Sequence, residues 1–292
     1  MADVQFEIPA RIRWLENVEG GLEWLRELPA RVARCVERWQ LRLESPYPQS
    51  FVSVVFPATS ADGSDAVLKM QWPHAESEYE DEALRLWNGN GAVRLFEFDR
   101  EDRALLLERC VPGDPLSTIH ADEALVVLTE MLPRLWVPAG RPFRTLSDEC
   151  RGWRKQLPVN WQLAGRPFDR AMLDDTTDAM DRLCGAQGDQ VLLHQDLHGD
   201  NVLRAAREPW LAIDPKPLAG EREFSLAPVI RSCEFGHSRA AVVHRLDTLT
   251  SALGLDRERC RLWALVQTLA WAFDGVTVLD QHLEIARWLW TA

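Results

Sequence analysis

Hydrophobic residues are spaced differently in successive parts of the chain, and these spacings predict its helices and strands. Between residues 21 and 39 apolar side chains recur at helical intervals. Pro29 lies in the middle of this stretch and predicts the start of a second helix, because proline suits a first helical turn. Residues 1–20 carry little pattern, so we expect them to form an arm.

Short runs rich in β-branched and aromatic residues follow, and they predict a sheet that contains one helix. The expected strands are 40–43, 51–56, 66–70, 92–98 and 104–109, with an acidic helix at 74–87 between the third and the fourth. A segment rich in proline and glycine, residues 110–115, then interrupts the pattern.

Helical spacing dominates the rest of the chain. We expect helices near 116–136, 145–157, 168–185, 224–233, 237–253, 256–274 and 280–291. The whole pattern predicts an α+β protein with a small mixed lobe at 1–109, a hinge at 110–115 and a mainly helical large lobe at 116–292.

One polar stretch between two short apolar runs carries the clearest chemical signal. Residues 194–201 are His-Gln-Asp-Leu-His-Gly-Asp-Asn, and a second apolar run ends at Asp214. The spacing His-x-Asp-x-x-x-x-Asn, followed by a strand-terminal Asp, is typical of kinase-type phosphotransferases. In that arrangement Asp196 accepts the proton of the attacking hydroxyl, while Asn201 and Asp214 hold Mg²⁺ against the phosphates of ATP. His194 completes the motif, and we expect it to stabilise the loop rather than act as the base.

Two other interpretations of this stretch stay open at the level of sequence. His194, Asp196 and His198 could form a metal-binding cluster, since imidazole and carboxylate groups suit zinc or iron. The other histidines lie singly and far away along the chain, which leaves such a site short of ligands. The stretch could also be a polar turn between strands, but the acid thirteen positions after Asn201 favours the kinase interpretation.

The predicted small lobe supplies residues for nucleotide binding. Lys69 ends an apolar strand after a hairpin, which matches the lysine that contacts nucleotide phosphates in kinase folds. In the acidic helix that follows, Glu82 borders the apolar stripe, and we expect it to pair with Lys69. In the hinge we expect the Glu108 carbonyl and the Cys110 amide to hydrogen-bond adenine.

Composition narrows the choice of function. A formal net charge of −12 argues against nucleic acid as a partner, because its phosphates need a basic face. Three lysines (Lys69, Lys155 and Lys216) stand against 30 arginines, and none lies in a Walker A motif, which excludes a P-loop NTPase. No Gly-x-Ser-x-Gly elbow is present, so the usual serine hydrolase is excluded as well.

We also expect a cytoplasmic protein. The start of the chain has no basic segment followed by an apolar one, and no run of about eighteen apolar residues occurs. The six cysteines lack paired spacing and are expected to be reduced. We expect a monomer that binds a small molecule and has no nucleic-acid or membrane partner.

Several stretches resemble the aminoglycoside phosphotransferase family, and more closely its streptomycin 6-phosphotransferase and hydroxyurea phosphotransferase branch. They are 28–36, 66–69, 105–109, 194–201 and 208–215, and they are spread over most of the chain. The last of them, with Trp210 and Pro215, is more specific to this branch than the general kinase motif. The resemblance implies a two-lobed protein-kinase-like fold and ATP- and Mg²⁺-dependent O-phosphorylation of a small molecule. It implies streptomycin as the leading acceptor, and hence antibiotic inactivation.

The chain departs from the family pattern in two places. After the metal-binding Asp the family has Gly-Asp-Pro-x-x-Asp-Leu, whereas here Glu221 and Ser225 replace the two acids. The second acid is expected to stabilise the catalytic loop, so its loss bears on rate or substrate. The loop before Phe51 has no glycines, and we assign no phosphate-binding role there.

Recognition of the acceptor is less well defined by the sequence. A guanidinium or ammonium group is held best by carboxylates. The large-lobe acids that suit this role are Asp148, Glu149, Glu234, Asp274 and Asp280. Trp271 offers an aromatic surface on which a cation can stack. We favour Asp274, which follows Trp271 closely, and include Glu234 as a further contact.

Two rival functions fit the same residues. The first is a kinase of the same fold that acts on a hydroxyurea-like compound or another metabolite. The second is a non-catalytic nucleotide-binding module. Ser225 favours this alternative, but the presence of all four residues expected for catalysis disfavours it (Lys69, Asp196, Asn201 and Asp214). A protein kinase is less consistent, because there is no Asp-Phe-Gly, no Ala-Pro-Glu and no room for an activation segment between Asp214 and Phe224.

Overall fold

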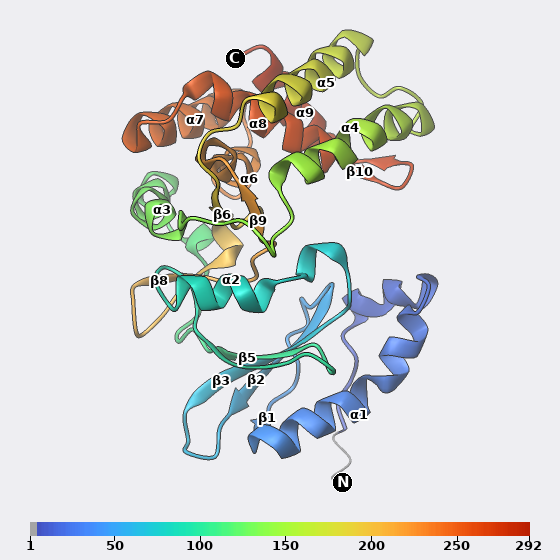
Figure 1. The fold of residues 1–292 in the computed structure, drawn as a ribbon, viewed down its shortest axis with the longest axis vertical. Coiled ribbons are helices and arrows are strands. Elements are labelled where there is room, and N and C mark those ends of the chain that lie inside the picture. The colour runs from blue at the N-terminus through green and yellow to red at the C-terminus, as the bar shows by residue number, and fades with distance from the viewer. Residues whose placement is uncertain (1–4) are drawn as a thin grey trace. The chain divides into compact units, whose positions relative to one another are not determined.

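The computed structural model describes residues 5–292, which divide into two units (Figure 1). The first contains the described residues up to Gly113 together with Ala205–Arg207. The second contains Asp114–Arg204 and Glu208–Ala292. The chain passes from the first unit to the second between Gly113 and Asp114, a point that lies within the hinge predicted at 110–115.

The first unit is built on a five-stranded antiparallel sheet in the order β1-β2-β3-β5-β4. Its strands are β1 (Arg42–Leu43), β2 (Ser53–Thr59), β3 (Asp65–Gln71), β4 (Leu95–Asp99) and β5 (Ala104–Glu108). The five strands predicted from the sequence are therefore all present, with ends shifted by up to three residues.

Alternation along β3 assigns its side chains to opposite faces of the sheet. Leu68 and Met70 point into a core that they share with Leu28 and Val32 of α1 (Gly21–Trp39). Because successive side chains on a strand point to opposite faces, Lys69 points away from this core. Helix α2 (Glu80–Trp87) lies on that other face (Figure 1).

One prediction about the N-terminal segment is wrong. Pro29 does not start a second helix, because α1 runs through it without a break and buries Leu28 and Val32 on either side. The arm predicted at 1–20 lies outside the described residues at 1–4. Within the described part, the 3₁₀ helix Ala10–Asn17 buries Ile12 and Leu15 completely in the core of the first unit, which stabilises the segment although its local pattern is weak.

The second unit is mainly helical. Its helices are α3 (Ala121–Leu135), α4 (Leu146–Leu163), α5 (Arg170–Gly185), α6 (Ala227–Arg231), α7 (Arg239–Leu253), α8 (Arg257–Ala270) and α9 (Asp280–Trp290). Helix α8 is buried on nearly all sides and contacts α4, α5, α6, α7 and α9. The helix predicted at 256–274 ends at Ala270, and the short hairpin of β10 (Phe273–Asp274) and β11 (Thr277–Val278) follows it.

Two short antiparallel ladders carry the polar motif of the second unit. They are β6 (Val191–Leu193) with β9 (Leu218–Gly220), and β7 (Val202–Arg204) with β8 (Trp210–Ala212). The loop 194–201 joins β6 to β7, and the loop 213–217 joins β8 to β9. Among the described helices none is both long and apolar enough to cross a bilayer.

Candidate active site

Backbone hydrogen bonds hold the two loops of the predicted motif side by side. The amide of Ile213 donates to the carbonyl of Asn201 at 2.9 Å, and the amide of Lys216 donates to the carbonyl of His194 at 2.9 Å. These bonds continue the pairing of the adjacent strands, so the local sequence of short strands and polar loops suffices to bring the residues around Asp196 and Asp214 together.

Asp196 lies in the first loop with both carboxylate oxygens facing cations. The guanidinium of Arg231 donates to Oδ1 at 3.1 Å, and the ammonium of Lys216 lies 3.1 Å from Oδ2. The Asp196 side chain is 14% exposed, so it stays accessible while being held on two sides. Charge-assisted contacts of this kind orient a carboxylate.

Asn201 is oriented by the same loop. Its side-chain Nδ2 donates to the Asp196 carbonyl at 2.9 Å. Because the amide nitrogen is committed to this bond, Oδ1 is the atom of Asn201 that can face a cation.

The backbone is strained on either side of this arrangement. Asp214 has φ 56° and Gln195 has φ 62°, both in the left-handed region that non-glycine residues rarely adopt. Such conformations cluster at functional sites, where the surrounding structure holds them in place. Here Gln267 of α8 holds one of them, since its Nε2 donates to the Gln195 carbonyl at 2.9 Å.

His194 occupies a buried position behind the loop. Its Nε2 lies 2.9 Å from the Ile213 carbonyl, and only 4% of the residue is exposed. Burial lowers the pKa of His194 to about 4, so the ring is neutral at physiological pH and donates from Nε2. This geometry agrees with the predicted loop-stabilising role and removes His194 from any metal cluster with Asp196 and His198.

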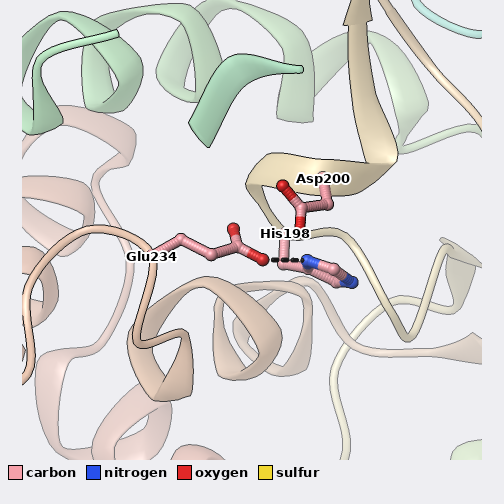
Figure 2. Close-up of side chains that lie close together, drawn as sticks. All are labelled: His198, Asp200 and Glu234. Carbon is pink, nitrogen blue, oxygen red and sulfur yellow. Dashed lines mark hydrogen bonds and ion pairs between the residues drawn. The ribbon is translucent and has the colours of Figure 1, made fainter. Parts of the chain in front are cut away.

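His198, Asp200 and Glu234 converge beside the loop (Figure 2). Their ligand atoms lie within 4.8 Å of one another, which is the one such group among residues 5–292 that could hold a metal ion. His198 Nδ1 already lies 2.6 Å from Glu234 Oε1, so two members of the group neutralise each other. A side chain at Gly199 would place its Cβ 2.5 Å from Glu234 Oε2, so only glycine permits this approach.

The pKa values of this histidine and glutamate move apart. Burial lowers the pKa of His198, but the hydrogen bond to Glu234 and the charge of Asp196 outweigh it, and the net pKa is raised. Burial raises the pKa of Glu234, but the hydrogen bond and charge of His198 outweigh it, and the net pKa is lowered. Both shifts favour the ion pair.

Helices α6, α8 and α9 supply a second layer that the sequence did not reveal. Arg231 ends α6; its Nε donates to Gln267 Oε1 at 3.3 Å, and its Nη1 lies 3.4 Å from His282 Nε2. Burial, and next the charge of Arg231, lower the pKa of His282 to about 4, so its neutral ring accepts from Arg231 and donates from Nδ1 to the Trp271 carbonyl at 3.0 Å. This layer fixes the guanidinium that holds Asp196.

Of the three predicted acceptor contacts, two lie near the loop 194–201 and one has no link to it. The ring of Trp271 faces the chain's own cations, with Lys216 Nζ 4.7 Å and the Arg231 guanidinium 4.5 Å from its centroid. Glu234 reaches the loop through His198. Asp274 lies exposed on the β10–β11 hairpin and forms no ion pair with any described residue. The structure therefore brings Trp271 and Glu234 to the motif, and it gives Asp274 no link to it.

In the first unit Lys69 is paired with Glu80, which corrects the predicted partner. Lys69 Nζ lies 2.7 Å from both carboxylate oxygens of Glu80. Glu82 instead is 40% exposed and lies 3.4 Å from Arg85. The reason is helical geometry: Glu80 shares the buried face with Ala83, Leu84 and Trp87, at spacings of three, four and seven. This spacing was visible in the sequence and identifies Glu80.

Glu108 and Cys110, the predicted adenine contacts, differ in the hydrogen bonds that their atoms form within the chain. The Glu108 carboxylate accepts from Arg207 Nε at 2.8 Å and Nη2 at 2.9 Å, and from the Arg94 amide. Burial raises the pKa of Glu108, but these partners outweigh it and lower the net pKa. The Cys110 amide donates no hydrogen bond within residues 5–292, whereas the Glu108 side chain is fully committed.

The two departures from the family pattern have different consequences. Glu221 is buried and accepts from Arg259 Nε at 2.8 Å, from the Gly188 amide at 3.2 Å and from the indole of Trp263. It therefore links α8 to the segment that leads into β6. Ser225 accepts from Trp136 Nε1 at 3.1 Å and donates to the Arg222 carbonyl. Its contacts are made next to Glu221 and none reaches the catalytic loop.

Comparison with known proteins identifies the family of this chain. A family model described as aminoglycoside/hydroxyurea antibiotic resistance kinase matches residues 38–275. The chain belongs to this family. The resistance kinases are small-molecule phosphotransferases, and the matched range includes the loop 194–201 and Asp214.

Two relatives of this chain have the same sequence identity to it. A streptomycin 6-kinase from Streptomyces griseus is 40% identical over 89% of this chain and 88% of its own. A hydroxyurea phosphotransferase from Kitasatospora aureofaciens is 40% identical over 96% of this chain and 84% of its own. Identity alone therefore does not separate the two acceptors.

A solved structure identifies the fold. A choline kinase from Streptococcus pneumoniae superposes with a TM-score of 0.64 over 91% of this chain and 100% of its own, at 12% identity. This chain thus has the protein-kinase-like fold of the aminoglycoside and choline kinases, with an N-terminal antiparallel sheet and a helical C-terminal part. The predicted fold class is confirmed.

Proposed function

We propose that the protein transfers the γ-phosphoryl group of ATP to a hydroxyl group of a small molecule. The observation that carries this proposal is the environment of Asp196. A partly exposed carboxylate is held by two cations at 3.1 Å, in a loop whose Asn201 is fastened to it by a hydrogen bond. An oriented and partly exposed carboxylate can accept the proton of a hydroxyl, which phosphoryl transfer to an alcohol requires.

The mechanism follows from these positions. The acceptor hydroxyl hydrogen-bonds to Asp196, which directs a lone pair of its oxygen at the γ-phosphorus. As the new O–P bond forms, the bond from phosphorus to the bridging oxygen breaks, ADP leaves with that electron pair, and the hydroxyl proton passes to Asp196. The transition state is loose, so orientation and charge stabilisation contribute more than basicity.

The chemistry of the donors in the loops fits a magnesium ion. Asn201 has its Oδ1 available, and Asp214 supplies a partly exposed carboxylate, so the set consists of the hard oxygen ligands that Mg²⁺ prefers. Asn201 and Asp214 would hold the ion, which would neutralise charge on the phosphates when bound. Asp214 directly follows Ile213, whose amide donates to the Asn201 carbonyl at 2.9 Å, so the backbones of the two expected ligands are close together.

In the first unit we assign Lys69 to the non-transferred phosphates. Glu80 fixes its ammonium in place, and a fixed cation stabilises phosphate charge without reorganising. We assign adenine recognition to backbone atoms of the hinge, the Glu108 carbonyl and the Cys110 amide. The unsatisfied Cys110 amide supports this assignment, because backbone donors normally find a partner.

For the acceptor we propose streptomycin, with hydroxyurea as the alternative. The 40% identity to kinases of both compounds supports either one. Streptomycin carries guanidinium groups, and Glu234 near the loop and the exposed Asp274 offer carboxylates for such groups. Hydroxyurea is small and uncharged and needs none of these acids.

Purified protein should therefore release ADP from Mg-ATP in the presence of streptomycin. The assay includes other aminoglycosides and hydroxyurea, and the Asp196→Ala variant serves as the control for contaminating kinases. Stimulation by streptomycin alone supports the proposed acceptor, and stimulation by hydroxyurea alone replaces it. Nucleotide binding without turnover on any compound would mean a non-catalytic module and would overturn the proposal.

A further inference from the structure

The loop 213–217 contains a lysine for which the proposed mechanism has not yet given a role. Lys216 follows Asp214 by two positions and is one of only three lysines in the sequence, against 30 arginines. Its Nζ lies 3.1 Å from Asp196 Oδ2 and 4.7 Å from the centroid of the Trp271 ring. The question is why a chain that uses arginine nearly everywhere keeps a lysine at its proton acceptor.

Asp196 already has a permanent cationic partner in Arg231. The Arg231 side chain is 12% exposed, and Gln267 and His282 hold its guanidinium from behind. One fixed guanidinium is enough to orient a carboxylate. A second cation is therefore not needed to hold Asp196.

Arg231 and Lys216 thus place two cations directly against one carboxylate, each 3.1 Å from one of its oxygens. His198 Nε2 lies farther away, at 4.0 Å from Asp196 Oδ1, and its other ring nitrogen is paired with Glu234. A cation that is not needed to orient the carboxylate can attract an anion next to the acceptor hydroxyl.

The anion that must arrive at this point is the phosphoryl group in transfer. Two hydrogen-bond partners of one carboxylate oxygen lie roughly 5 Å apart, so the Lys216 ammonium lies about that far from a hydroxyl bound at Oδ2. The phosphorus under attack approaches within roughly 3–3.5 Å of that hydroxyl oxygen. Its equatorial oxygens therefore come within reach of the ammonium.

Lys216 is better suited than Arg231 to make this contact. Its side chain is 22% exposed, whereas that of Arg231 is 12% exposed and tied to α8 and α9. A lysine is a compact charge on a flexible stem with rotatable donors, so it can move a short distance during transfer. The Trp271 face under it limits that movement to the neighbourhood of Asp196.

We propose that Lys216 is a catalytic residue that contacts the transferred phosphoryl group and stabilises the charge on its equatorial oxygens. This inference rests on the proposed phosphotransfer function and deepens it. Lys216 forms and breaks no covalent bond in this role; the hydroxyl proton still passes to Asp196. Its role resembles that of the cation other phosphotransfer enzymes supply to the transition state.

The test compares Lys216→Met, Lys216→Arg and a matched control, Lys155→Met, which removes an exposed lysine on α4. We expect kcat to fall by about 10²–10³-fold in Lys216→Met, with KM for ATP and for the acceptor within about threefold of wild type. Lys216→Arg should recover part of kcat, and Lys155→Met should match wild type. Thermal unfolding of each variant checks that it is folded.

A second readout separates a phosphoryl contact from support of Asp196. Calorimetry measures binding of Mg-ADP with and without aluminium fluoride, a mimic of the phosphoryl group in transfer. We expect Lys216→Met to bind ADP alone normally and to lose at least about tenfold of the extra affinity that the fluoride gives. Equal loss for both ligands, or unchanged kcat in an active wild-type background, would overturn the inference.

Failure of the proposed function gives a different pattern. A wild-type protein that turns over no acceptor would overturn the phosphotransferase assignment, and the role of Lys216 would fall with it. An active wild type with an equally active Lys216→Met variant would leave the function intact and overturn the role of Lys216 alone.

Discussion

Two of the three lysines form ion pairs with a carboxylate, one in each unit, and the two pairs differ in nearly every physical respect. Lys69 and Glu80 have side chains 7% and 2% exposed, and the ammonium lies 2.7 Å from both oxygens. The side chains of Lys216 and Asp196 are 22% and 14% exposed. Lys216 pairs with one oxygen of the carboxylate, and Arg231 pairs with the other.

The two pairs differ in whether the carboxylate can still accept a hydrogen bond from a further group. In the first unit Gln71 Nε2 adds a hydrogen bond of 2.6 Å to Glu80, so the carboxylate is saturated and the lysine is fixed. In the second unit Asp196 Oδ2 faces Lys216 at 3.1 Å, while Oδ1 faces Arg231 at 3.1 Å and His198 Nε2 at 4.0 Å. Each oxygen accepts at most one short hydrogen bond from these groups and keeps capacity for a further donor. A proton acceptor needs that spare capacity, and a phosphate-binding cation needs rigidity instead.

The largest effect should follow from removing Asp196, the proposed proton acceptor. We expect Asp196→Ala to lower kcat by about 10²–10⁴-fold, the usual range for loss of a proton-transfer group. Folding should be retained, because the loop keeps its backbone bonds through Asn201 and Lys216. The measurement is ADP release under saturating ATP and acceptor, and turnover near that of wild type would remove Asp196 from the mechanism.

A smaller effect, on stability rather than on chemistry, should follow from breaking the buried pair. We expect Glu80→Gln to lower the free energy of unfolding by about 3 kcal/mol, since removing one partner of a buried pair leaves the other charge uncompensated. KM for ATP should rise with it, because Lys69 loses its fixed position. Urea unfolding and ATP titration measure the two quantities.

Glu82→Gln provides the matched control on the same helix. Glu82 is 40% exposed and pairs with Arg85, so its loss should change the free energy of unfolding by no more than about 0.5 kcal/mol. A larger effect for Glu82 than for Glu80 would contradict the pairing in the structure and restore the partner expected from the sequence.

The pair of Lys69 and Glu80 also shows how much of the structure the sequence predicts. The spacing of apolar residues predicts α2, and the order of strands and helix predicts that an acid on α2 meets Lys69. The choice between Glu80 and Glu82 depends on which face is buried, and the spacings to Ala83, Leu84 and Trp87 decide it. The information was in the sequence, and the prediction used adjacency to the apolar stripe where it should have used the helical period.

The surroundings of Asp196 were predictable only in part. The linear motif predicts Asp196, Asn201 and Asp214 because they lie in two loops joined by neighbouring strands. Arg231 and His282 come from α6 and α9, 35 and 86 positions after Asp196, and no local pattern links them to it. Their contacts depend on how the helices pack around α8, which periodicity along one chain does not specify.

The smallest effect concerns a third ion pair, between His198 and Glu234, which is partly exposed like that of Lys216. The pKa of His198 is raised, so its contribution to stability is fully present below its ordinary value near 6.5 and is lost as the pH rises through the folded value. The pKa of Glu234 is lowered, so its contribution is lost only in acid. Stability from this pair should therefore decrease on going from pH 6 to pH 9.

Comparing wild type with His198→Gln isolates this contribution, because the buried His194 and His282, with pKa values of about 4, titrate alike in both proteins. We expect the difference in free energy of unfolding to shrink by about 1 kcal/mol or less between pH 6 and pH 9, as for other partly exposed pairs. Glu234→Gln should show the same loss, since it removes the cause of the raised pKa. A difference that stays constant with pH would mean that the pKa of His198 is the same in the folded and unfolded protein, which would contradict a stabilising ion pair with Glu234.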